Sequence, residues 1–153
     1  MNKYVVMLLA APVMLAASPA PQSVQLSSTV MAEKTVSVGG REQVELKTPG
    51  SVLPGDRLIF QTNYRNGGGQ PAMQVVVTNP VPAAVAWTGE ATPGAVESVD
   101  GGKTYAPFVQ LKVKGADGAL RPAQPADVTH IRWTLASIAP GASGLVKYRG
   151  MVR

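Results

Sequence analysis

The sequence contains few residues that could act as an acid, a base or a nucleophile. The only histidine is His130, and the acidic residues Glu90, Glu97 and Asp100 lie near one another in the chain. Two carboxyl groups on either side of a glycosidic bond would suit hydrolysis, so a small secreted hydrolase is one hypothesis. The spacing selects no pair of carboxylates, and the GASG stretch around Ser143 lacks the G-x-S-x-G pattern of a nucleophile elbow. We therefore expect no catalytic residue and a protein that is not an enzyme.

Metal and cofactor chemistry has little support in the composition. The chain has no cysteine, one histidine and six methionines without clustered spacing, so soft or nitrogen ligands are scarce. We expect no metal and no cofactor. Calcium bound by Asp100, Asp117 or Asp127 near their glycines stays an open alternative, although no EF-hand pattern is present.

Two glycine-bearing loops are candidate interaction sites. One is residues 66–69, and the other is the tip of the stretch SVDGGKTY at residues 98–105. The second stretch resembles the Asp-box hairpin of sialidase-type propellers, which implies that Ser98, Asp100 and Thr104 bond the backbone of their own turn. The alternative is a contact with glycan or a partner, because loops on a rigid scaffold often bind. The candidate interaction residues are Asn66, Gly67, Gly68, Gly69, Asp100, Gly101, Gly102 and Lys103.

The elements that would position these loops are short β-type runs separated by turn residues. Turn signals recur as PGD, NGGG, NP, PG and DGG, which leaves no room for a long helix and predicts an all-β sandwich or barrel. The expected strands span residues 29–38, 43–48, 57–65, 73–78, 83–89, 95–99, 104–113, 128–135 and 143–152. The longest loops are expected at residues 66–72 and 115–127.

Alternation within these runs predicts antiparallel sheets with one packed face. In RLIFQTNYR, Leu58, Phe60, Thr62 and Tyr64 share one face, whereas in VTHIRWTL the residues Ile131, Trp133 and Leu135 oppose His130, Arg132 and Thr134. We expect Trp133 and Trp87 in the core and His130 on the surface. The run at residues 143–153 could be an exposed edge strand that pairs with a partner, although its outward Lys147, Arg149 and Arg153 argue against pairing.

Two stretches carry a resemblance to a known family. The order PGDRLIFQTNYRNGGGQPAMQVVVTNPVPAAVAW (54–87) followed by IRWTLASIAPGASGLVKYRGMV (131–152) resembles the bacterial surface-protein repeat called domain of unknown function eleven. The resemblance implies an immunoglobulin-like β-sandwich of about seven to nine strands, and it supplies no catalytic residues. The family often has Asp where this chain has Asn79, and it often occurs as tandem copies, whereas this chain has one.

The N-terminal segment predicts export. A cationic start with Lys3 precedes an uncharged apolar run at residues 4–17, too short for a membrane-spanning helix and followed by small residues and prolines. We expect a signal peptide at residues 1–20 with an uncertain cleavage site, a linker at 21–28, and the immunoglobulin-like domain at 29–153. Periplasm or the cell surface is the expected location.

The charge pattern and the expected compartment bound the function. The formal net charge is +5, but the basic residues are scattered, so we expect no nucleic-acid partner, and the mature chain carries no membrane span. The leading hypothesis is an exported non-catalytic module with a structural or interaction role at the bacterial cell envelope, with an envelope protein or glycan as its partner. The alternatives are a periplasmic carrier or accessory subunit that holds a partner protein, and the small secreted hydrolase.

Overall fold

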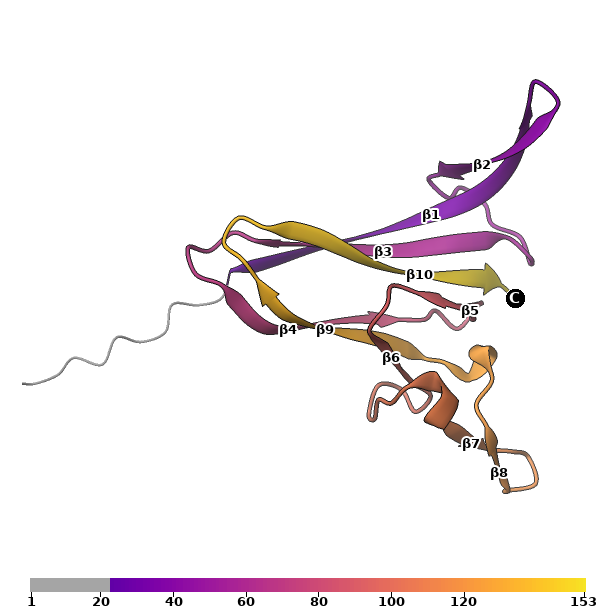
Figure 1. The fold of residues 1–153 in the computed structure, drawn as a ribbon. Coiled ribbons are helices and arrows are strands. Elements are labelled where there is room, and N and C mark those ends of the chain that lie inside the picture. Colours follow the sequence, from indigo (N-terminus) through magenta and orange to yellow (C-terminus); the bar gives the residue numbers. More distant parts are fainter. Residues whose placement is uncertain (1–22) are drawn as a thin grey trace, which may run out of the picture.

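The computed structural model describes residues 23–153 as an all-β protein with antiparallel sheets (Figure 1). The expected signal peptide, and residues 21 and 22 of the expected linker, lie outside these residues. The described elements are β1 (Val24–Val38), β2 (Arg41–Lys47), β3 (Arg57–Asn66), β4 (Ala72–Pro80), β5 (Val85–Ala91), β6 (Ala95–Ser98), η1 (Phe108–Gln110), β7 (Lys112–Lys114), β8 (Leu120–Pro122), η2 (Pro125–Asp127), β9 (His130–Ile138) and β10 (Ser143–Val152), where η marks a 3-10 helix.

The strands form two facing sheets and one separate hairpin. The larger sheet has the order β2-β1-β3-β10-β5, and the smaller has the order β4-β9-β6. Figure 1 shows the two sheets as layers, with the β7–β8 hairpin extending away from them and the β1–β2 hairpin projecting at one end. The chain passes from one layer to the other between β3 and β4, between β4 and β5, between β5 and β6, and between β9 and β10.

The core lies between the two layers and confirms the alternation read from the sequence. Trp133 and Trp87 are 2% and 6% exposed, and each indole N–H donates to a backbone carbonyl. The ring of Phe60 stacks on that of Tyr148, with centroids 4.7 Å apart. Both layers contribute to one cluster, whose buried members are Ala32, Leu58, Val77, Val81, Val85, Trp87, Val128, Ile131, Trp133, Val146 and Tyr148.

Three expectations about individual strands are wrong. β1 begins at Val24 rather than near residue 29, because residues 24–28 pair with β3 instead of forming a linker. The expected strand at 104–113 is mostly a capped turn followed by η1, and only Lys112–Lys114 is a strand. The expected edge strand at 143–153 is an interior strand, because β10 pairs with β3 on one side and β5 on the other.

The region expected as a long loop at residues 115–127 also has internal structure. It contains β8 and η2, and the guanidinium of Arg121 donates two bonds to the Asp127 carboxylate, at 2.7 and 3.0 Å. Within residues 23–153, no helix has both the length and the apolar character needed to cross a membrane.

Candidate functional site

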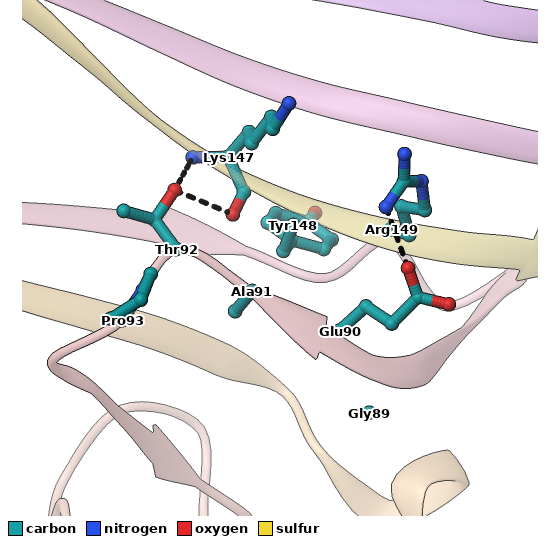
Figure 2. Close-up of a pocket in the computed structure, with 8 residues that line it drawn as sticks. All are labelled: Gly89, Glu90, Ala91, Thr92, Pro93, Lys147, Tyr148 and Arg149. Atoms are coloured by element: carbon teal, nitrogen blue, oxygen red, sulfur yellow. Dashed lines mark hydrogen bonds and ion pairs between the residues drawn. The ribbon is translucent and has the colours of Figure 1, made fainter.

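A shallow pocket lies where β5 separates from β10. Its volume is about 380 Å³, and Figure 2 shows that Gly89 to Pro93 of β5 and the following turn line one side and Lys147 to Arg149 of β10 the other. The register between the two strands shifts between Tyr148 and Gly150, so the strands stop pairing regularly there. Thr92 restores contact, because its hydroxyl accepts a bond from the Lys147 N–H at 2.9 Å and its own N–H donates to the Lys147 carbonyl at 2.8 Å.

Charged side chains beside this pocket form one network across four strands. Arg149 donates to Glu33 at 2.8 Å and to Glu90 at 2.6 Å. Arg57 contacts the same two carboxylates, at 3.3 and 3.2 Å. The two carboxylates raise the pKa of Arg149 above its usual value, Glu33 having the larger effect. Glu90 is therefore bound by two guanidinium groups and serves to tie β5 to β3 and β10.

The side chains of Ser98, Asp100 and Thr104 bond their own turn, as the resemblance to the Asp-box implies. Asp100 accepts bonds from the Ser98 hydroxyl at 2.7 Å, the Thr104 hydroxyl at 2.6 Å, and the backbone N–H groups of Lys103 and Thr104 at 3.0 Å each. The Ser98 hydroxyl oxygen also accepts from the Gly102 N–H at 2.9 Å. These bonds, the one from the Thr104 hydroxyl first, hold the pKa of Asp100 far below its usual range.

A polar cluster that the sequence did not predict surrounds this turn on the outer face of the smaller sheet. The guanidinium of Arg132 lies 3.5 Å from the centre of the Tyr105 ring and donates to the Thr78 hydroxyl at 3.1 Å. Nδ1 of His130 lies 3.2 Å from the Thr129 hydroxyl oxygen. The pairing of β9 with β6 on one side and with β4 on the other brings these groups together, and the sequence offered only the β9 alternation as a signal.

Two of the candidates for acid–base chemistry, Glu97 and His130, face opposite ways. Glu97 pairs in register with the core residue Ile131, whereas the adjacent Ser98 pairs with His130, so Glu97 and His130 project from opposite faces of the smaller sheet. Glu97 is 4% exposed, and burial raises the pKa of its carboxyl group, partly offset by a bond from the Phe108 N–H. The structure therefore does not join Glu97 and His130 in one site.

Asn66 is a buried brace rather than part of an open loop. It is 1% exposed, and its amide nitrogen donates to the carbonyls of Gln70 at 2.8 Å and Ile138 at 2.9 Å. Its amide oxygen accepts from the Gly68 N–H at 2.9 Å. Of the loop residues nominated with it, Gly67 and Gly69 are exposed, and Gly67 is tied by its N–H to the Ser23 carbonyl at 2.8 Å.

The remaining acidic candidates are engaged locally and stand apart. Asp117 accepts from the Ala119 N–H at 3.0 Å, and Asp127 is bonded to Arg121. Arg121 lowers the pKa of Asp127, as does the bond from the Gln124 N–H. In the described part of the chain, no three His, Asp or Glu side chains gather closely enough to hold a metal ion.

A second pocket, about 250 Å³ in volume, opens between the edges of the two layers. It is lined mainly by apolar groups, with contributions from β1, β3, β10 and the segment that ends β4. Inside it, the Ser28 and Thr62 hydroxyl oxygens are 3.0 Å apart, and the Thr62 hydroxyl donates to the Asn79 side-chain oxygen at 2.9 Å. The Tyr148 hydroxyl donates to the Pro80 carbonyl at 2.7 Å. An apolar side chain suits this pocket better than an ion.

Comparisons with protein-family models, curated proteins and solved structures return no match to this chain. The function proposed below consequently depends on the residues and their geometry.

Proposed function

We propose that this chain is an exported, non-catalytic β-sandwich module with a structural or interaction role at the bacterial cell envelope. Export is supported by the N-terminal sequence, where a cationic start precedes a short apolar run and then small residues, the order typical of a secretory signal peptide. The absence of cysteine means that a domain in an oxidising compartment would depend on its core and its sheet pairing for stability.

One observation carries the non-catalytic part of the proposal: the nominated polar side chains are already bonded within the chain or separated from one another. Asp100 has four donors, and Glu90 has two arginine partners. Glu97 and His130 point to opposite faces. A general acid or base must reach the proton that it transfers, and the two groups of a pair must flank the same bond of the substrate. These side chains instead fasten turns and strands.

We propose that the fold is immunoglobulin-like in its two-layer architecture, not in the order of its strands. Two antiparallel layers around one core support it. In the immunoglobulin constant domain, the last strand pairs with the strand that precedes it in the chain, and both lie in the layer that does not contain the first strand. Here the last strand, β10, lies between β3 and β5 in the layer that also holds β1. Related sandwiches vary in topology, so the proposal concerns the two-layer architecture.

Exposed apolar side chains favour an interaction role. Val109 on η1 is 88% exposed, Leu53 on the loop between β2 and β3 is 68% exposed, and Leu120 on the β7–β8 hairpin is 66% exposed. Segments outside the sheets of a rigid scaffold often carry binding residues, and a partner that contacts these segments would cover these side chains. We expect the partner to be an envelope protein or glycan.

Cell fractionation combined with N-terminal mapping tests the compartment. We expect the purified chain to lack roughly its first 20 residues and to be found in the envelope or the medium. Recovery in the cytoplasm with Met1 intact would overturn the proposal.

Cross-linking in envelope extracts then separates the structural module from the accessory subunit. A stoichiometric protein partner supports the accessory-subunit alternative, and binding to wall glycan alone supports a structural module.

The hydrolase alternative has its own test. Glu97→Ala, Asp100→Ala and His130→Ala variants are screened for turnover of chromogenic glycosides and esters beside the unchanged chain. We expect no turnover by any of them. Turnover by the unchanged chain that disappears in a folded variant would establish an enzyme and refute the non-catalytic role.

A further inference from the structure

Half of β1 has an open edge. β3 pairs with β1 from Val24 to Glu33, but β2 pairs only with residues 32–38 on the other side. Residues 24–31 therefore have no neighbouring strand on that side within the described chain. Edge strands of this kind present unpaired backbone groups to other strands.

The alternation of hydrogen-bonding direction along β1 determines which backbone N–H and C=O groups point to this open side. The Gly67 N–H donates to the Ser23 carbonyl at 2.8 Å, so Ser23 directs its bonding groups toward β3. Bonding direction alternates along an antiparallel strand. The backbone N–H and C=O groups of four residues therefore point to the open side, namely those of Val24, Leu26, Ser28 and Val30.

The open edge lacks the features that usually prevent strand pairing. Its sequence, VQLSSTVM, has no charge and no proline, whereas four of the seven residues of β2 (REQVELK), the edge strand that continues this side of the sheet, are charged. Leu26 and Val30 belong to the face that bears the core residue Ala32, yet they are 52% and 38% exposed. Their side chains lie on the inner face without a covering layer.

The apolar pocket of 250 Å³ adjoins the same edge. Ser28, Thr29 and Val30 form part of its lining, with Phe60 and Tyr148 behind them. A strand added at the edge would direct alternate side chains to the inner face, over the mouth of this pocket. Backbone bonding and a side-chain pocket together make up strand addition as a mode of recognition.

We propose that the occupant of this edge is β1 of a second copy of this chain, paired antiparallel about a two-fold axis at Ser27. In this register Val24 lies opposite Val30 of the second copy, and Leu26 lies opposite Ser28. All four open residues then exchange backbone bonds in both chains. The inference rests on the proposed interaction role and specifies its surface.

A second copy of the edge fits this surface without electrostatic repulsion. No charge meets a like charge, because residues 24–31 have none. Leu26 of each copy comes to lie opposite Ser28 of the other, at the mouth of the apolar pocket. β2 begins to pair at Ala32, so it ends the shared segment at both sides of the two-fold axis.

Sedimentation equilibrium of the purified chain, with its N-terminus mapped by mass spectrometry, tests the association. We expect a dimer, and we expect Val30→Lys to weaken dimerisation at least tenfold because it places a charge at the new strand pair. Val76→Lys is the matched control, because Val76 is 49% exposed on β4, an edge strand of the smaller sheet. We expect this variant to dimerise like the unchanged chain. If Val30→Lys fails to fold, Leu26→Lys at the 52% exposed position replaces it.

Disulfide trapping tests the register, because the chain has no cysteine of its own. Ser27 sits on the two-fold axis in a non-hydrogen-bonded pair, where Cα atoms are about 4.5 Å apart, within the range that a disulfide spans. We expect Ser27→Cys to form a covalent dimer under mild oxidation and Val44→Cys, on the charged β2 edge, to form far less.

Two outcomes overturn the inference. One is a chain that stays monomeric at every concentration, even if its edge binds a strand from another protein. The other is an equal yield of covalent dimer from Ser27→Cys and Val44→Cys. These results are separable from the proposed function. A monomer recovered from the envelope refutes the strand pairing alone, whereas a dimer retained in the cytoplasm refutes the envelope role alone.

Discussion

Replacing Asn66 tests the claim that this residue is a buried brace between the two layers rather than part of an exposed interaction loop. Asn66→Asp keeps the size of the side chain but replaces the NH₂ group with oxygen. That group donates to two carbonyls, those of Gln70 at 2.8 Å and Ile138 at 2.9 Å. A carboxylate there would face two acceptors inside a site that is 1% exposed.

The magnitude follows from the bonds lost. A hydrogen bond contributes about 1 kcal/mol net, and each buried group left without a partner costs about 1–3 kcal/mol. Two lost bonds and one buried carbonyl left without its donor, that of Ile138, predict that Asn66→Asp lowers the free energy of unfolding by roughly 3–5 kcal/mol at neutral pH. That loss is a large part of the stability of a domain, which is about 5–15 kcal/mol in general.

The effect of Asn66→Asp on the free energy of unfolding should also depend on pH in a defined direction. The two carbonyls and burial raise the pKa of the introduced carboxyl in the folded state above its value in the unfolded chain. Its protonated form can donate one bond, so the variant is most stable below the unfolded pKa and loses stability as the pH rises through the folded pKa. The deficit relative to the unchanged chain should therefore grow from mildly acidic to neutral pH.

Urea unfolding followed by tryptophan fluorescence measures this, because Trp87 and Trp133 both lie in the core. Asn63→Asp, at a half-buried position on the outer face of the same strand, is the matched control, for which we expect a change within about 1 kcal/mol. A loss below about 1 kcal/mol for Asn66→Asp, or one that does not vary with pH, would refute the bracing role.

Three further predictions follow from the same structure. Asp100→Ala should lower the thermal unfolding midpoint, and because the folded-state pKa of Asp100 is lowered, the difference from the unchanged chain should shrink as pH falls below the ordinary aspartate range. Gly150→Ala should cost about 1–3 kcal/mol in urea unfolding, because the added Cβ overlaps the Val85 side chain, whereas Gly50→Ala has no neighbour within 4 Å and should be nearly neutral. Burial raises the pKa of Tyr148, so spectrophotometric titration should show a step above the ordinary tyrosine range, and Tyr148→Phe should abolish that late step.

The local pattern predicted strand positions well where turns and alternation agree. The runs around Leu58, Trp133 and Tyr148 form β3, β9 and β10, with the expected inward faces. The stretch at 104–113 failed because Pro107 and the bonds to Asp100 hold the backbone in a turn before η1, although its composition suits a strand. Hydrogen bonding within a turn outweighed β-propensity there.

The candidate site was predictable as residue types but not as an arrangement. The motif SVDGGKTY indicated which side chains bond the turn, since Ser98, Asp100 and Thr104 are close in the chain. The contact of Tyr105 with Arg132 depends on β6 lying beside β9, and no local signal encodes that neighbour. For the same reason the sequence suggested an open loop at Asn66, whose Ile138 partner is distant in the chain.

The sequence by itself determined the class of the fold, because period-two alternation and frequent turns act over a few residues and need no distant partner. Only the tertiary structure decided which strands are edges. β10 carries the outward charges of an edge strand yet lies between β3 and β5, while the uncharged start of β1 is open. Strand neighbours are set by how two layers bury a common core, a property of the whole chain rather than of any single strand.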